Sequence, residues 1–345
     1  MRIMIDILHP AHVHFFRNFI KEMEKRGHEI LVTARKKDVA LDLLRLYKIK
    51  HHVLSELKPG RLNMILELIQ RDIRFIRLAR KFHPDITIGL MGATISTTNP
   101  FLKSKCIVCW DTEHSIFTNF FAFLLSDVVI TPDCYEGKVF KIHGKKIGYT
   151  GYHELMYLHP NKFKPNPAIL KKAGLKKNEK FFIIRFVSWH ASHDSGDEGF
   201  ADKMSFVKEL EKYGRVLITS EDKLPKEMER YRIKVPADKL HDLLAFSNLY
   251  VGESATIASE AACLGVPAIF LSTSKRGYTN EQERKYGLVF NFSEQEKAMK
   301  KALELLERKN LKQEFMEKRR RMLKDKIDST SWLVDFVEGY YKNKA

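Results

Sequence analysis

Short apolar runs alternate with amphipathic segments through the first 131 residues of the chain. Runs of strand length lie at 2–8, 29–33, 51–54, 86–89, 105–109 and 127–131. Segments with the apolar spacing of amphipathic helices lie between them, at 14–26, 37–46 and 62–82. Strands separated by helices indicate a parallel sheet with right-handed crossovers, and such sheets bind ligands at the carboxyl ends of their strands.

The alternation stops at 150–167 and then begins again. Three prolines within eight residues, Pro160, Pro165 and Pro167, break any helix there and stiffen the chain, which is typical of a connector. Strands are then expected at 181–187, 215–219, 248–251 and 268–271, and helices at 200–212, 238–246, 293–307, 311–325 and 331–342. The pattern predicts an α/β protein of two doubly wound Rossmann-like domains that face a central cleft. We assign them to 1–152 and 168–328, with a linker at 153–167 and a separate last helix within 329–345.

Bulk composition narrows the class of protein. The chain has 345 residues and a formal net charge of +17, which indicates an acidic partner such as nucleic acid, an anionic membrane or a phosphorylated substrate. Nucleic acid is disfavoured because no RNA-binding or helix-turn-helix motif accompanies the charge. No apolar run reaches the roughly 18 residues of a membrane span, and Met1 leads directly into a strand, so no signal peptide is expected. These features favour a cytoplasmic protein.

The residues 252–267, G-E-S-A-T-I-A-S-E-A-A-C-L-G-V-P, join two predicted strands through a turn of small residues and a helix. The first N–H groups of a helix have no internal partner and carry partial positive charge, so Ser254, Ala255 and Thr256 could hold a phosphate. Glu260, further along the helix, is placed to accept hydrogen bonds from a pair of sugar hydroxyls. The alternative is an ordinary turn, with Ser254 as a helix cap and Glu260 solvated.

Three histidines follow the first strand, at the expected carboxyl edge of the sheet. His9 precedes a proline and suits a turn, whereas His12 and His14 are candidate catalytic residues. A histidine at a helix N-terminus is kept neutral by the helix dipole and can act as a base or orient a hydroxyl. The alternative is that one histidine caps the helix and another packs in the core.

Two further loops follow predicted strands. The first, at 109–119, carries Glu113 as a second candidate base and Asn119 as a candidate substrate contact. Arg185 lies within a predicted strand, where a buried arginine must be paired and a phosphate is one possible partner. Ser188 begins the polar loop that follows this strand, and we list it with Arg185 as a substrate-binding candidate.

Metal binding is not expected. Cys106 and Cys109 form a C-x-x-C, but they lie in a predicted strand, where residues three apart face opposite sides. No D-x-D is present to hold a diphosphate through a divalent ion. A His190–His193–Asp194 site is the weaker alternative.

The segments 62–82 and 116–125 suggest contact with a membrane. The first combines isoleucines with arginines at three-residue spacing, as in helices that lie on anionic membranes, although a solvated face is an equal alternative. The second is strongly apolar and too short to span.

Several motifs resemble known families. L-H-P-A-H-V-H, W-D-T-E-H, G-Y-H-E-L and F-V-S-W-H-A-S-H-D resemble the DUF354 family, within the GT-B glycosyltransferase superfamily. The pattern is also similar to the bacterial lipid II-forming N-acetylglucosaminyltransferases, the non-hydrolysing UDP-N-acetylglucosamine 2-epimerases, and archaeal enzymes that build lipid-linked chitobiose. The resemblance implies that Ser254, Ala255 and Thr256 hold a diphosphate, that Glu260 binds the uridine ribose, and that the last helix crosses back to the first domain. It also places Glu113 and His14 at or near conserved acceptor-side motifs of these enzymes. A glycine-rich loop of the transferases is replaced here by His-Pro-Ala-His-Val-His.

The expected function is that of an inverting, metal-independent transferase without a cofactor. It would move N-acetylglucosamine from UDP to a lipid-diphosphate-linked sugar at the cytoplasmic face of an anionic membrane. The alternatives are a 2-epimerase acting on free UDP-N-acetylglucosamine and a catalytically silent nucleotide-sugar-binding subunit. The sequence leaves the sugar, the acceptor and the oligomeric state open.

Overall fold

The fold was analysed in a computed structural model, which describes residues 1–37, 39–56, 60–113, 116–138, 145–176, 178–187, 199–220 and 223–342. Side chains are described throughout these ranges except at 61, 62, 116–119 and 121. The chain forms two compact units. The first contains Met1–Lys162 and Ile327–Ala345, and the second contains Phe163–Lys326.

The first unit is built on a seven-stranded parallel sheet with the order β3-β2-β1-β4-β5-β6-β7. Its strands are β1 (Arg2–Ile7), β2 (Glu29–Lys36), β3 (His52–Glu56), β4 (Ile86–Leu90), β5 (Lys105–Cys109), β6 (Val128–Pro132) and β7 (Lys145–Tyr149). The order reverses direction at β1 and β4, and this switch point is where doubly wound sheets bind ligands.

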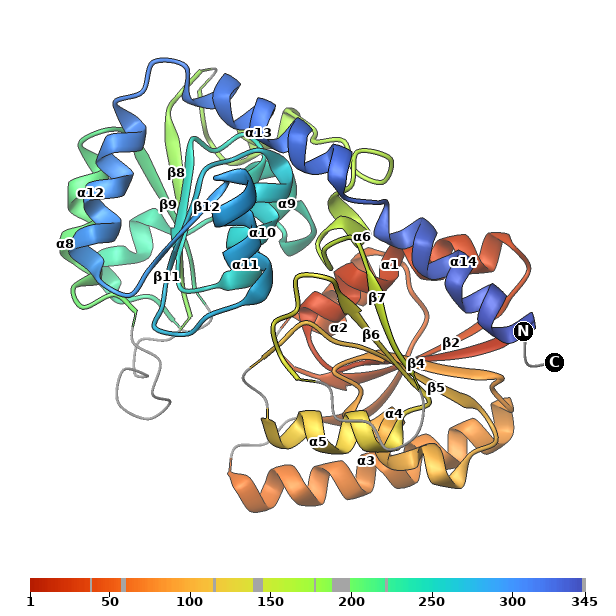
Figure 1. Ribbon diagram of the computed structural model, residues 1–345. Coiled ribbons are helices and arrows are strands. Elements are labelled where there is room, and N and C mark those ends of the chain that lie inside the picture. The colour runs from red at the N-terminus through yellow and green to blue at the C-terminus, as the bar shows by residue number, and fades with distance from the viewer. Residues whose placement is uncertain are drawn as a thin grey trace. The chain divides into compact units, whose positions relative to one another are not determined.

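Helices cover both faces of this sheet (Figure 1). One face carries α1 (Pro10–Lys25), α2 (Ala40–Leu46), α6 (Leu155–Leu158) and α14 (Ser329–Lys342). The other carries α3 (Arg61–Phe82), α4 (Ala93–Thr98), η1 (Asn99–Phe101) and α5 (Ile116–Leu125). The last helix therefore belongs to the first unit, where Thr330 donates a hydrogen bond to the carbonyl of Met156 at 2.5 Å.

A buried ion pair lies at the carboxyl end of β1. Arg71 of α3 donates from Nη2 to Oδ1 of Asp6 at 2.5 Å, and both side chains are almost fully buried. The same guanidinium donates to Ser55 of β3 and Thr94 of α4, each at 3.0 Å, while Thr33 of β2 donates to Asp6 at 2.6 Å. The ion pair and its hydrogen bonds thus join three strands and two helices, because a buried charge is tolerated only when it is paired and hydrogen-bonded.

The second unit has a five-stranded parallel sheet with the order β12-β11-β10-β8-β9. Its strands are β8 (Phe181–Phe186), β9 (Arg215–Ser220), β10 (Leu249–Gly252), β11 (Ala268–Leu271) and β12 (Val289–Phe292). In Figure 1, α8 (Lys203–Glu211) and α12 (Gln295–Leu306) lie on one face of the sheet. The other face carries α9 (Leu240–Leu244), α10 (Ala255–Leu264), α11 (Gly277–Glu281) and α13 (Leu311–Asp325). Shorter helical turns are α7 (Ala168–Lys172), η2 (Lys226–Tyr231), η3 (Ala237–Lys239) and η4 (Gln282–Tyr286).

The structure differs from the expected elements in several places, and helices such as α4 and α11 were not expected. The strands β7 and β12 were not predicted. Helix α1 begins at Pro10, one turn before the expected 14–26. The segment 153–158 is not an exposed connector, because its residues are buried in the first unit, and the division between units comes after Lys162. Within the described residues, no helix has both the length and the apolar character that crossing a membrane requires.

The ion pair predicts a strong stability effect. Arg71→Ala should lower the free energy of unfolding by about 3–5 kcal/mol, because it leaves the buried Asp6 carboxylate without its countercharge. Arg77→Ala, an exposed position on the same helix, should change it by less than about 0.5 kcal/mol. Urea unfolding of both variants measures the difference, and equal stabilities would contradict the assigned role of Arg71.

Candidate active site

The turn between β1 and α1 is fixed by its own side chains. His9 caps the helix, with its Nδ1 accepting the backbone N–H of Ala11 at 3.2 Å, and Pro10 occupies the first helical position, which needs no donor. His12 then lies in the first turn of α1, and its Nδ1 accepts the N–H of Leu8 at 3.3 Å. This hydrogen bond assigns the proton of a neutral His12 to Nε2, so His12 is a donor rather than a base.

His12 lies in a positively charged environment. Its side chain is buried, and burial, followed by the charges of His9, Lys37, Arg71 and His153, holds its pKa well below 6.5. A neutral imidazole with Lys37 among its neighbours at the carboxyl end of β1 suits an anionic ligand, although Arg71 and His153 already have the carboxylates of Asp6 and Asp111 as partners.

His14 occupies a different side of α1 from His12. Because the helix begins at Pro10, His14 is not at its N-terminus, and the expectation that the helix dipole acts on it at that position is wrong. Its ring packs against Tyr47 and Tyr157, with centroid distances of 5.8 and 5.4 Å, and its Nδ1 lies 3.3 Å from the Tyr47 hydroxyl. Arg17 donates to that hydroxyl at 2.6 Å.

Acidic residues follow β5 at the same edge of the sheet. Asp111 comes two residues after the end of β5, and its Oδ2 lies 2.8 Å from Nδ1 of His153. Thr112 donates to the other oxygen of Asp111 at 3.0 Å. Glu113 accepts the backbone N–H of Glu136 at 3.3 Å through Oε1. Two carboxylates are therefore held at the carboxyl end of β5, and one of them is positioned by a buried histidine.

Glu113 also affects a neighbouring phenol. Burial, and then the charge of Glu113, raises the pKa of Tyr135 to about 12. Tyr135 lies in the turn after β6, so this phenol stays protonated as a potential donor at neutral pH.

In the second unit, the turn between β10 and α10 has the geometry of a capped helix start. Ser254 is the N-cap, and its Oγ accepts the N–H of Ile257 at 3.4 Å. The N–H groups of Ala255 and Thr256 belong to the first turn, so no carbonyl within the helix accepts hydrogen bonds from them. This feature is consistent with the ordinary cap as well as with an anion site.

Glu260 is buried, so the alternative of a solvated helix residue is wrong. Its Oε1 lies 2.9 Å from Nε2 of His241, which is also buried and comes from α9. The helix ends at Gly265, whose positive φ of 79° favours glycine, and a side chain there would meet Met316 at 2.7 Å. Arg319 donates to the carbonyl of Cys263 at 2.7 Å and thereby stabilises this end of the helix.

Arg185 and Glu253 lie where β8 and β10 end. Arg185 donates to Thr219 of β9 at 2.8 Å, which gives it a partner within the sheet. Glu253 accepts the backbone N–H of Val187 at 2.9 Å and that of Phe200 at 3.0 Å. One carboxylate therefore joins the two chain positions on either side of the segment 188–198.

Several expected residues lie outside the described part of the chain. They are Ser188 and the group His190, His193 and Asp194, together with the side chain of Asn119. Within the described residues, no cluster of three metal-ligating side chains is present. Cys106 and Cys109 are both buried in β5, and burial raises the pKa of the Cys109 thiol.

Sequence reasoning missed three residues, namely His153, His241 and Glu253. His153 lies in the quoted motif G-Y-H-E-L, which was a usable signal but was assigned to the connector. His241 had no such signal, because its partner Glu260 lies 19 residues away in the chain. Glu253 lies in the quoted stretch 252–267, but its partners are backbone groups of distant residues, which the sequence does not indicate.

The two parallel sheets with helices on both faces make an α/β two-domain fold of the GT-B type. Among solved structures, a UDP-N-acetylglucosamine 2-epimerase from Neisseria meningitidis bound to UDP-GlcNAc matches with a TM-score of 0.67 and 15% identity, covering 98% of this chain and 100% of that one. A putative UDP-N-acetylglucosamine 2-epimerase from Listeria monocytogenes matches with a TM-score of 0.69 and 13% identity, over 99% and 97% of the two chains. The spinosyn rhamnosyltransferase SpnG complexed with spinosyn aglycone matches with a TM-score of 0.62 and 13% identity, covering 98% of this chain and 100% of that one.

The chain belongs to the family described as "Protein of unknown function (DUF354)", which matches residues 1–342. "Uncharacterized protein MJ0665" of Methanocaldococcus jannaschii is 23% identical over 277 residues, or 77% of this chain and 80% of that protein.

The environment of His12 predicts a pH-dependent stability. A histidine whose pKa is lowered on folding binds its proton more readily when unfolded, so stability should be full above pH 6.5 and should decrease as pH falls below it. His12→Asn keeps an acceptor for the Leu8 N–H without titrating, so this variant should lose less stability between about pH 7 and 5. Urea unfolding across that range tests this, with the exposed His52→Asn as control. Parallel pH profiles for all three proteins would contradict it.

Proposed function

We propose that this protein is an inverting, metal-independent glycosyltransferase that moves N-acetylglucosamine from UDP-N-acetylglucosamine to a lipid-diphosphate-linked sugar. The observation that carries the proposal is the β10–α10 segment, in which a helix that starts with small residues at Ala255 carries the buried carboxylate of Glu260. The GT-B fold supports it, because solved proteins of this fold include one bound to UDP-GlcNAc and one that transfers rhamnose.

In this proposal the second unit binds the donor. The N–H groups of Ala255 and Thr256, with the hydroxyls of Ser254 and Thr256, bind the diphosphate, whose charge the helix dipole stabilises. Glu260 accepts hydrogen bonds from the ribose hydroxyls, and His241 fixes its orientation from the opposite side. Arg185 supplies a further positive charge near the end of β8. Because charge develops on the leaving UDP, these prearranged donors lower the barrier to its departure.

The first unit binds the acceptor. Lys37 and the imidazoles around His12 supply charge and N–H donors to a phosphate-bearing acceptor, while Arg71 remains paired with Asp6. Nε2–H of His12 donates to an acceptor oxygen, since Nδ1 is used by Leu8. In this proposal, imidazole N–H groups take the place of the glycine-rich loop of the similar transferases.

The reaction is a displacement at the sugar's anomeric carbon. The acceptor hydroxyl forms the new bond as the bond to UDP breaks, which inverts the configuration, and the hydroxyl proton passes to a base. We assign Glu113 as the base, with the Asp111–His153 pair as a positioning group. The packing of His14 between two tyrosines favours Glu113 over His14 for this role.

A membrane partner is supported by the surface of α3. Exposed Met64, Ile65, Leu66 and Ile69 lie in the first half of this helix, and exposed Ile73 lies just after its midpoint. The second half carries exposed Arg74, Arg77, Arg80 and Lys81. An apolar surface next to cations suits the interface of an anionic membrane. We therefore propose that the protein acts at the cytoplasmic face of the cell membrane.

Two conservative variants test this proposal. Glu260→Gln preserves an acceptor for His241 but loses the carboxylate charge, so it should weaken UDP binding about tenfold, the effect of one charged hydrogen bond. Glu113→Gln should leave UDP binding unchanged and slow transfer by about 10²–10⁴, the usual contribution of a general base. Calorimetry with UDP and transfer assays with UDP-N-acetylglucosamine and a membrane lipid extract measure these effects.

Each variant is a control for the other, because Glu260→Gln should change UDP binding and Glu113→Gln should change the rate of transfer. His14→Ala should retain more transfer than Glu113→Gln. Wild-type transfer by both Glu260→Gln and Glu113→Gln would refute the assigned roles.

The second candidate is a 2-epimerase acting on free UDP-N-acetylglucosamine. It is favoured by the two epimerase structures, whose TM-scores exceed that of the rhamnosyltransferase. It needs neither lipid nor membrane. A third candidate, a silent binding subunit, would bind UDP without turnover.

Solvent exchange discriminates these candidates. If the protein is a transferase, incubation with UDP-N-acetylglucosamine alone in D₂O should leave the C2 proton of the sugar in place, because that bond is never broken. Proton NMR of the recovered nucleotide sugar measures this. Deuterium at C2 would replace the transferase by the epimerase, and Glu260→Gln serves as the control that reports dependence on this site.

A further inference from the structure

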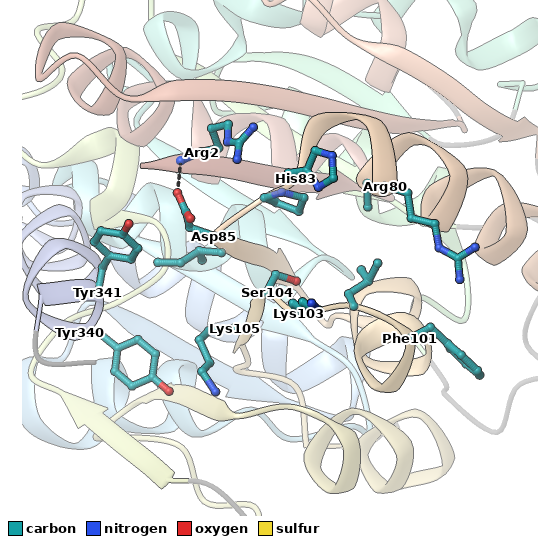
Figure 2. Close-up of a pocket in the computed structure, with 14 residues that line it drawn as sticks. Arg2, Arg80, His83, Asp85, Phe101, Lys103, Ser104, Lys105, Tyr340 and Tyr341 are labelled. Carbon is teal, nitrogen blue, oxygen red and sulfur yellow. Dashed lines mark hydrogen bonds between the residues drawn. The ribbon is translucent and has the colours of Figure 1, made fainter. Parts of the chain in front are cut away.

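A hollow of about 820 Å³ lies in the first unit at the amino ends of its central strands. Its lining includes Arg2, Ile86 and Lys105, which begin β1, β4 and β5. The last turn of α3, the turn η1 and the end of α14 complete it (Figure 2). Because the strands are parallel, this hollow lies at the opposite edge of the sheet from His12, Asp111 and Glu113. The candidate active site therefore does not account for it.

The charge of the lining is mainly positive. Arg2, Arg80 and Lys103 are exposed, and within the described residues no carboxylate lies at ion-pair distance from them. The one acid of the lining, Asp85, accepts the backbone N–H of Arg2 at 2.6 Å. Lys105 lies 3.6 Å from Asp127, which is outside the hollow. Three cations are thus left for a ligand.

A buried hydroxyl also lines the hollow. Ser104 is 6% exposed, and its Oγ has no hydrogen-bond partner among the residues that the structure describes. Buried polar groups are as a rule hydrogen-bonded, and each exception requires an explanation. A ligand oxygen in the hollow would supply the missing partner.

The remaining wall is apolar and aromatic. Phe101 and Leu102 contribute from η1, and the rings of Tyr340 and Tyr341 contribute from α14. Figure 2 shows the two tyrosine rings near Lys105 and Asp85. Phe101 is among the most exposed large apolar side chains of the described chain. A ligand that fits this lining has an anionic group and an apolar part.

We propose that this hollow, hereafter the amino-end site, binds a phosphorylated ligand. Arg2, Arg80 and Lys103 bind the phosphate together with the hydroxyl of Ser104, and the apolar part of the ligand lies against Phe101. A phosphate is favoured over a carboxylate because a tetrahedral dianion offers acceptor oxygens to several cations and a hydroxyl at once. The proposal does not depend on the assigned reaction, since it concerns a separate edge of the sheet.

The test measures binding to the full chain by calorimetry, with saturating UDP present so that a nucleotide site is already occupied. One probe is inorganic pyrophosphate, and the other is dihexanoyl phosphatidic acid kept below its micelle concentration. Arg80→Glu and Lys103→Glu should each weaken binding about tenfold through lost charge-assisted bonds. Ser104→Ala should weaken it by a smaller factor, with unchanged thermal stability, because Oγ has no partner to lose.

Arg77→Glu is the matched control. This variant makes the same charge change as Arg80→Glu, one turn away on α3 and outside the lining of the hollow. Its affinity for the probes should therefore stay within about twofold of that of the wild type, as expected for a screened exposed charge. If the wild type prefers phosphatidic acid and Phe101→Ser loses this preference, the ligand is a lipid phosphate. If Phe101→Ser binds pyrophosphate with the affinity of the wild type and the wild type shows no such preference, the ligand is a free phosphate. Equal weakening in Arg80→Glu and Arg77→Glu, or no binding of either probe, would overturn the proposal.

Discussion

The pairing of Arg71 with Asp6 is the interaction on which the first unit depends. A charged guanidinium is buried at the carboxyl end of the central strand only because Asp6, Ser55 and Thr94 together satisfy it. This requirement fixes α3 and α4 against the sheet. After burial and the charges of His9 and Lys37, the same positive charge also contributes to the lowered pKa of His12, so the fold and the candidate site share this residue.

Much of the fold was predictable because the signals were local. Buried central strands read as apolar runs, and helices read as periodic segments, so the two-unit α/β arrangement followed from the pattern. The misses have physical reasons. The edge strand β7 has the sequence K-K-I-G-Y, which shows little apolar character because much of it is exposed. The segment 153–158 was interpreted as part of the connector because of the prolines that follow it, although Leu155 and Tyr157 are buried in the first unit.

The candidate site, like the fold, was predictable only where its signals were local in the sequence. The helix start at Ser254 follows from residues next to one another in the chain, and its place after β10 follows from topology. The partners of Glu260 and Asp111 do not, because His241 and His153 reach them only through the folded sheets. His12 and His14 could not be separated either, since their different surroundings depend on whether the helix begins at Pro10 or one turn later.

The hydrogen bonds of Glu253 connect chain positions that are far apart in the sequence. One carboxylate accepts the backbone N–H of Val187, directly after β8, and that of Phe200, shortly before α8. Glu253 itself directly follows β10. A substitution at this one position therefore acts on the surroundings of two strands and a helix at once.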